Sequence, residues 1–131
     1  MTDWYEIVSR DSEKMGENRD CAVRAVTLAL GKPYAEVHAA MKRLGRRNRR
    51  GTPMWITAHV LESYGYKMVE CTNVFPSART PITVQRELPN RGVYLVRTRS
   101  HIFCYRAGKV HDWQAGRRHR VVSIFKIVRE K

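Results

Sequence analysis

The first third of the chain carries apolar residues at helical spacing. Residues 21–30 are apolar or small except for Arg24 and Thr27, and Gly31 follows them. A helix that is apolar on every side is usually buried at the centre of a domain, and a glycine is a common helix stop. The pattern predicts a central buried helix that ends before Gly31. Its N-cap is expected near Asn18–Asp20, because both end residues of that segment are good caps.

Two more helices are predicted before the middle of the chain. Apolar residues recur at helical spacing in residues 34–44, which follow a proline and precede Gly45. A third helix is predicted over residues 54–64, between Thr52-Pro53 and Gly65. The apolar patch at residues 4–8 predicts a short strand or helix packed on the body of the domain.

The period changes toward alternation in the last third, which is typical of strands. A short helix is predicted over residues 82–88, between the first predicted strand and the others. The predicted strands cover residues 66–72, 92–97, 101–105, 110–113 and 121–128. The order of helices followed by antiparallel strands predicts an α+β fold, and 131 residues fit one domain over residues 1–131.

Ala107-Gly108 is a tight-turn signal between two of these strands. A two-residue turn pairs Arg106 with Lys109. Because side chains alternate along a strand, this register places four residues on one face: His101, Phe103, Asp112 and Gln114. His101 and Asp112 are then diagonal neighbours within reach of each other. His111 and Cys104 point to the opposite face.

Cys21 is the candidate nucleophile because it lies in the first turn of the predicted central helix. A nucleophilic cysteine needs a low thiol pKa, a base within reach and a group that orients the base. The helix N-terminus stabilises a thiolate and offers free backbone N–H groups for an oxyanion. His101 is the candidate base, and Asp112 is the candidate orienting residue.

The other cysteines, Cys71 and Cys104, are interpreted as core residues. Three widely spaced cysteines without a Cys-x-x-Cys pair make a disulfide framework or a zinc site improbable. Free thiols indicate a reducing compartment. We therefore expect no metal and no cofactor. His38 and His59 are interpreted as surface or boundary residues. Trp55 and Trp113 are interpreted as core or rim aromatics, and lining a substrate groove is an alternative for Trp113.

With a cysteine that opens a helix, followed later by a histidine and an aspartate on a hairpin, the chain resembles the papain-like cysteine peptidase superfamily. It resembles the small bacterial and phage members of that superfamily more closely. The segment Asn18-Arg-Asp-Cys21-Ala-Val-Arg-Ala matches their Asn-x-Asp-Cys-x-x-Arg-Ala motif. Gly92, Tyr94, Val96 and His101 match Gly-x-Tyr-x-Val-x-x-x-x-His, and Asp112 completes His-Asp. The resemblance covers residues 17–114. It implies a thiol protease or amidase of papain-like fold that hydrolyses a peptide or protein substrate.

The chain departs from this family at one position. Papain-like enzymes often carry a glutamine about six residues before the cysteine as an oxyanion donor, and Met15 stands there. Asn18 is the nearest amide and the candidate substitute. Losing one oxyanion donor typically lowers the rate by about 10²–10³. The family also includes members that keep the fold without activity, so an inactive binding protein is the alternative.

The net charge of +13 favours binding to polyanions. Residues 42–50 contain six Lys or Arg in nine positions. The candidate contacts to nucleic acid or another polyanion are Arg43, Arg46, Arg47, Arg49, Arg50, Arg117, Arg118 and Arg120. Such binding fits a virion component or a host-takeover factor. The chain shows no signal peptide and no membrane span, which predicts a cytoplasmic or virion-associated protein.

Overall fold

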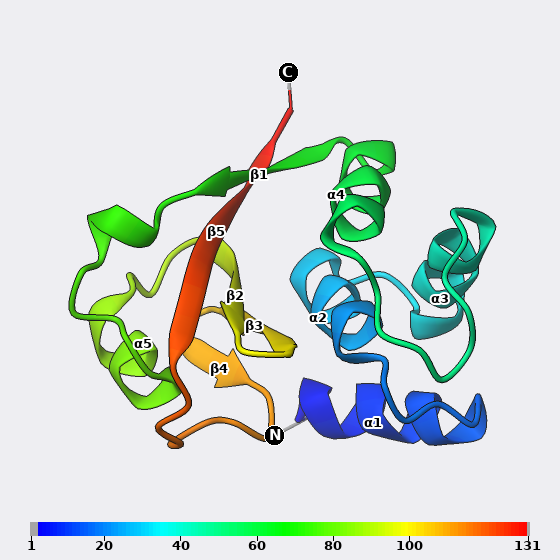
Figure 1. Cartoon of the computed structure of the whole chain (residues 1–131), viewed down its shortest axis with the longest axis horizontal. Helices are drawn as coiled ribbons and strands as arrows, with labels where there is room; N and C mark the ends of the chain where they lie inside the picture. The colour runs from blue at the N-terminus through cyan, green and yellow to red at the C-terminus, as the bar shows by residue number, and fades with distance from the viewer. Residues whose placement is uncertain (1–2, 131) are drawn as a thin grey trace.

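The computed structural model describes residues 3–130 and has helices first and a sheet second (Figure 1). The helices are α1 (Trp4–Lys14), α2 (Cys21–Leu30), α3 (Tyr34–Arg43), α4 (Met54–Ser63), the 3₁₀ turn η1 (Thr72–Val74) and α5 (Pro81–Glu87). The strands are β1 (Tyr66–Glu70), β2 (Val93–Thr98), β3 (His101–Arg106), β4 (Lys109–His111) and β5 (Val121–Arg129). The predicted α+β class is confirmed.

All five strands form one antiparallel sheet in the order β1-β5-β2-β3-β4. Helices α1–α4 lie on one side of this sheet and α5 on the other (Figure 1). Alternation along β3 explains how the sheet serves both sides. Ile102 and Cys104 pack with the first four helices, whereas Phe103 and Tyr105 pack in a second cluster with Val84 of α5.

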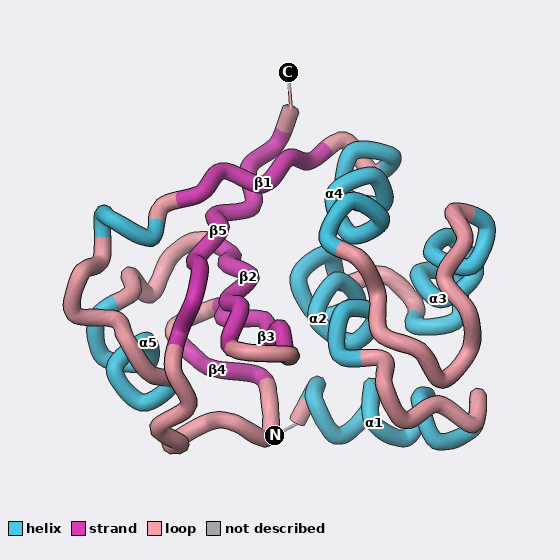
Figure 2. The backbone as a smooth tube through the Cα atoms, viewed as in Figure 1, coloured by secondary structure: helices cyan, strands magenta, loops and turns pink. Residues whose placement is uncertain are grey.

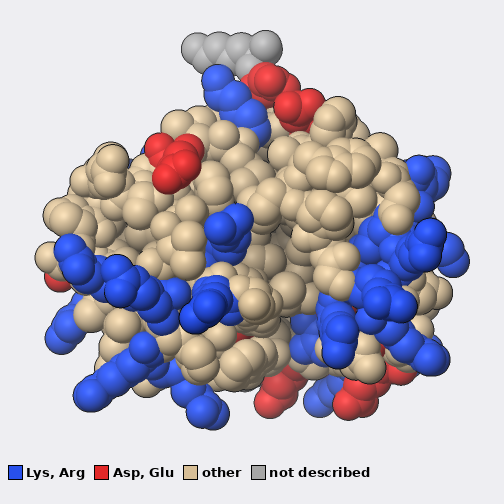
Figure 3. Space-filling model, in the orientation of Figure 1, with Lys and Arg blue, Asp and Glu red and all other residues tan. Residues whose placement is uncertain are grey.

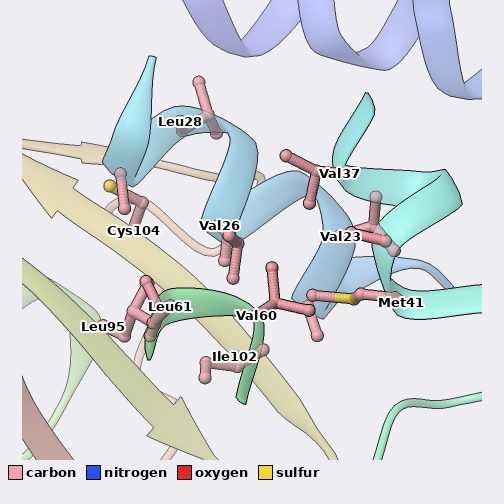
Figure 4. Close-up of a cluster of buried hydrophobic side chains, with 14 of the residues drawn as sticks. Val23, Val26, Leu28, Val37, Met41, Val60, Leu61, Leu95, Ile102 and Cys104 are labelled. Atoms are coloured by element: carbon pink, nitrogen blue, oxygen red, sulfur yellow. The ribbon is translucent and has the colours of Figure 1, made fainter. Parts of the chain in front are cut away.

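Helix α2 lies between the sheet and α3, and its side chains fill the larger core (Figure 4). Val23 and Val26 are fully buried there with Met41 of α3. Gly31 ends α2 in the left-handed conformation, with φ of 65°, and donates its N–H to the Thr27 carbonyl over 2.9 Å. The prediction of a buried central helix that stops at this glycine is confirmed.

Helix α2 starts where it was predicted, with its N-cap within Asn18–Asp20 and Cys21 in its first turn, but the cap residue does not bind the helix end. Asp20 occupies the N-cap position, yet its carboxylate makes no cap hydrogen bond. It accepts instead from Ser12 Oγ of α1 at 2.6 Å and from Tyr34 OH of α3 at 2.5 Å, and it pairs with Arg24 at 3.1 Å. The carboxylate therefore ties three helices together. The apolar patch at residues 4–8, for which a strand or a helix is predicted, is part of α1.

The hairpin formed by β3 and β4 has the predicted register, with Arg106 opposite Lys109 and the turn at Ala107-Gly108. Both turn residues have positive φ, 53° and 76°. Strand β4 is shorter than predicted and ends at His111, which pairs with Cys104. Asp112 and Trp113 therefore follow the strand, where the chain bends away from the sheet.

A bulge interrupts the pairing of β5 with β2. Arg97 pairs with Ser123, but Thr98 pairs with Val121, so Val122 has no partner on β2. A bulge changes the direction in which a side chain points. Val122 is accordingly exposed, at 44%, beside the end of β2. None of the helices in residues 3–130 has the length and apolar content to cross a bilayer.

Candidate active site

The three residues predicted for catalysis meet at the boundary between the helices and the sheet. Cys21 is the first residue of α2, His101 is the first residue of β3, and Asp112 follows the last residue of β4. His101 Nε2 lies 2.8 Å from Asp112 Oδ2. The other ring nitrogen, Nδ1, is therefore the one left for Cys21. The carboxylate fixes which nitrogen serves the thiol.

Asp112 is itself held in place by the chain that follows it. Its Oδ2 accepts from the Gln114 backbone N–H at 3.0 Å. The Gln114 side chain is buried and accepts from Thr98 Oγ1 at 3.1 Å. Thr98 ends β2, two residues after Val96 of the second core cluster. The bend that carries Asp112 is thus anchored to the sheet through Gln114 and Thr98.

The thiol of Cys21 has a pKa below its ordinary value. Burial opposes ionisation, but the hydrogen bond to His101 and its charge outweigh burial, with help from the backbone groups of Ile102 and Ala22. Ala22 lies in the first turn of α2, so the expected contribution of the helix N-terminus is present. The microenvironment favours a thiolate.

The imidazole of His101 shifts in the complementary direction. Burial lowers its pKa, but Asp112 and Cys21 together raise it to about 9. A lowered thiol pKa beside a raised imidazole pKa favours a thiolate–imidazolium pair at neutral pH. The other two cysteines have raised pKa values because of burial, Cys104 to about 12. Cys21 is therefore the thiol poised to react.

A cavity of about 590 Å³ opens beside this pair. Cys21, His101 and Asp112 line it together with Asn18 and Trp113. Asn18 is exposed and makes no side-chain hydrogen bond within residues 3–130, so its amide is free for a ligand. Met15 does not line the cavity. Trp113 is 49% exposed with its ring 5.2 Å from that of His101, which places it at the rim and not in the core.

A second hollow of about 370 Å³ lies on the other side of the pair. The two hollows share Cys21, Gly51, Ser100 and His101, so a groove passes over the thiol in both directions. Such a groove leaves room for chain on either side of a reacting carbonyl. We call the second hollow the Arg97 arm, because Arg97 lines it beside Met54 and Val122.

A buried charge cluster fixes one wall of the groove. Glu17 accepts from both terminal nitrogens of Arg46, at 3.0 and 3.1 Å, from the Arg49 backbone N–H at 2.8 Å, and from His38 Nε2 at 2.6 Å. Burial raises the pKa of Glu17, but these partners lower it to about 2. The cluster pins the loop that carries Gly51 to the loop that carries Asn18.

Two predictions about this cluster are wrong. His38 was expected at the surface or boundary, and it is buried against Glu17. Arg46 was expected among the polyanion contacts, but its guanidinium is fully buried and bound to Glu17 and Thr52. Charge density along a loop gave no sign that one arginine points inward. Arg46 is therefore a structural residue.

The remaining arginines of the two basic loops are exposed. Lys and Arg side chains gather on both sides of the central hollow (Figure 3). Figure 2 shows the loop between α3 and α4 on one side of the boundary between helices and sheet, and the loop between β4 and β5 on the other. Arg43, Arg47, Arg49 and Arg50 belong to the first side, and Arg117, Arg118 and Arg120 to the second. Gly51 and Trp113 bring these two loops to the same cavity.

The other candidate residues lie apart from the groove. Cys104 is fully buried, as predicted, whereas Cys71 is half-buried at the edge of the second core cluster. Trp55 is 55% exposed on α4, with its ring edge-on to that of His59, so of the two predicted positions, core or rim, it does not have the core one. Within the described residues, no group of three or more His, Cys, Asp or Glu side chains is arranged to hold a metal ion.

Comparisons with protein-family models, with curated proteins and with solved structures gave no match to this chain.

Proposed function

We propose that this protein is a small papain-like cysteine hydrolase that cleaves a peptide or other amide bond. The observation that carries the proposal is the Cys21–His101–Asp112 arrangement over an open groove. The thiol has a lowered pKa, the imidazole has a raised pKa, and the carboxylate binds the imidazole nitrogen that does not face the thiol. These are the aids that an attacking cysteine needs.

In the proposed reaction, the Cys21 thiolate attacks the carbonyl carbon and forms a C–S bond. The electron pair of the carbonyl moves to oxygen, where the backbone N–H at the start of α2 and the Asn18 amide stabilise the charge. His101 gives its proton to the leaving amine as the C–N bond breaks. Water then attacks the thioester, His101 takes its proton, and the C–S bond breaks to restore the thiolate. Asp112 orients His101 throughout.

Thiol labelling at controlled pH tests the proposal. Iodoacetamide should alkylate Cys21 of the wild-type protein well below the pH at which free cysteine reacts, because the thiolate is already present. His101→Ala should raise the pH midpoint, because it removes the hydrogen bond and the charge that lower the pKa of Cys21. Intact mass and peptide mapping locate the label, and the buried Cys104 serves as an internal control. Labelling of Cys21 no faster than free cysteine, unchanged in His101→Ala, would overturn the catalytic proposal.

A second candidate function is polyanion binding by the same fold without turnover. The chain has 25 Lys and Arg against 12 Asp and Glu, and the two exposed basic loops border one cavity. This function predicts DNA binding that weakens steeply with salt and survives Cys21→Ala. Measured by fluorescence anisotropy, absence of DNA binding at low salt would refute it.

A further inference from the structure

The Arg97 arm of the groove has an unusual composition. Arg97 and Arg99 supply positive charge, while Met54 and Val122 supply apolar surface. Within residues 3–130, no acidic side chain lines this hollow. The other cavity differs, because Asp20 and Asp112 line it together with arginines. The two arms therefore offer different surroundings to the parts of a substrate that lie on each side of Cys21.

Arg97 lies on the core-facing side of β2, at the position that follows two apolar residues. It shares a face of β2 with Val93 and Leu95, which pack against the helices. Its neighbours on the sheet are Ile102 of β3 and Ser123 of β5. Arg97 is half-buried, yet within residues 3–130 its guanidinium makes no hydrogen bond and no ion pair. A half-buried guanidinium at the wall of an open hollow, without a partner in the protein, is available to pair with a charged group of a ligand.

The apolar surface beside Arg97 comes from one side chain of the sheet and one of helix α4. Val122 is the residue without a partner at the bulge in β5, and the bulge turns it toward the hollow. Met54 reaches the hollow from the start of α4. A guanidinium flanked by two aliphatic side chains complements a ligand that has a short apolar stem and a carboxylate at its end. Glutamate and aspartate side chains have this form.

We propose that the Arg97 arm is a specificity subsite that binds an acidic side chain of a peptide substrate, with Arg97 as the residue that pairs with its carboxylate. The inference rests on the proposed hydrolase function and names its substrate class. The exposed basic loops on both sides of the cavity would draw an acidic polypeptide to the groove through long-range attraction.

The composition of this hollow favours a peptide over nucleic acid. Bases bind single-strand grooves by stacking on aromatic rings. Among the described residues, no Phe, Tyr or Trp lines the Arg97 arm, and its one aromatic ring is the imidazole of His101, which is engaged with Asp112 and Cys21. The two arginines of this arm, Arg97 and Arg99, lie beside Met54 and Val122 and do not form the longer row of cations that follows a phosphate backbone. Phosphate-driven binding therefore belongs to the exposed basic loops and not to this subsite.

The test uses epoxysuccinyl probes with alanine-based peptide arms on both sides of the electrophile. In matched pairs, one position in one arm carries glutamate or glutamine, so both directions of the groove are sampled. The measured quantity is the rate of Cys21 labelling by intact mass, divided by the iodoacetamide rate of the same variant. We expect glutamate in one arm to label about tenfold faster than glutamine, as befits a charge-assisted hydrogen bond.

Three variants test whether Arg97 is responsible. Arg97→Gln should abolish the glutamate preference, and Arg97→Glu should reverse it, so that the glutamine probe labels faster than the glutamate probe. Arg86→Gln removes the same charge from the exposed face of α5 and should keep the preference. Equal rates for glutamate and glutamine in both arms, or a preference that persists in Arg97→Gln, would refute the subsite.

Two further results separate the alternatives. If a DNA oligonucleotide protects Cys21 from iodoacetamide in an Arg97-dependent manner while glutamate gives no advantage, the arm binds phosphate and the proposal is wrong. If iodoacetamide labels Cys21 no faster than free cysteine, the proposed hydrolase function is wrong. The glutamate-to-glutamine ratio can still be measured at higher pH, where any accessible thiol reacts, so the subsite is judged on its own.

Discussion

Replacing Glu17 with glutamine is expected to destabilise the protein strongly. Glu17 is the only acidic partner of Arg46 within the described residues, and both side chains are fully buried. Glutamine keeps the size and one acceptor oxygen, but it leaves the guanidinium charge without compensation. Removing one partner of a buried ion pair typically costs about 3–5 kcal/mol. The same variant also weakens the hold on the Arg49 backbone and on His38.

The acid dependence of stability gives an independent magnitude. A Glu17 pKa lowered from 4.5 to about 2 corresponds to about 3 kcal/mol of stabilisation at neutral pH. Because the folded-state pKa is depressed, this contribution is complete above pH 4.5 and disappears as the pH falls toward 2. The wild-type protein should therefore lose about 3 kcal/mol through this window from this group alone, and Glu17→Gln should not.

Urea unfolding followed by circular dichroism at several pH values measures both effects. The matched control is Glu13→Gln, which changes the charge equally at an exposed position of α1. At neutral pH we expect a loss of about 3–5 kcal/mol for Glu17→Gln and less than about 0.5 kcal/mol for the control. If Glu17→Gln costs less than about 1 kcal/mol, or if both variants follow the wild-type pH profile, the charge cluster does not stabilise the fold as argued.

Two more changes test the site and the hairpin that carries it. Asp112→Asn removes the carboxylate that raises the His101 pKa, so the pH midpoint for iodoacetamide labelling of Cys21 should rise and labelling at pH 6 should fall on the order of tenfold. An unchanged midpoint would show that Asp112 does not tune the pair. Gly108→Ala should cost about 1–2 kcal/mol in urea unfolding, because φ is +76° and an added Cβ would lie 2.9 Å from Asn90 Oδ1. A loss below about 0.3 kcal/mol would show that the turn tolerates the strain.

Local sequence signals were enough to predict where several helices end and how one pair of strands is aligned. Glycine and proline marked the ends of α2, α3 and α4, and the Ala107-Gly108 pair set the register of β3 with β4. That register was enough to predict that His101 and Asp112 lie together. The contact itself forms in a different way, because β4 ends at His111 and the bend after it brings Asp112 to the imidazole.

The features that sequence reasoning missed depend on partners far apart in the chain. Nothing near Glu17 indicates that it binds Arg46, and nothing near His38 indicates burial, because both effects come from the packing of α3 against the α1–α2 loop. Asp20 looks like a cap residue but bonds to side chains of α1 and α3. The bulge at Val122 has no glycine to mark it. Pairwise contacts of this kind leave no periodic pattern.

The order of Cys21 and His101 along the chain, with three α-helices and two strands between α2 and β3, has a consequence for synthesis. The thiol owes its low pKa chiefly to a residue that the ribosome adds much later. Until β3 has been made and has paired with β2, Cys21 is an ordinary thiol. In the nascent chain and in any unfolded copy, Cys21 therefore reacts only as fast as an ordinary cysteine, and the enhanced reactivity arises when β3 is in place. Cys21 labelling would in turn report how much of a sample is native.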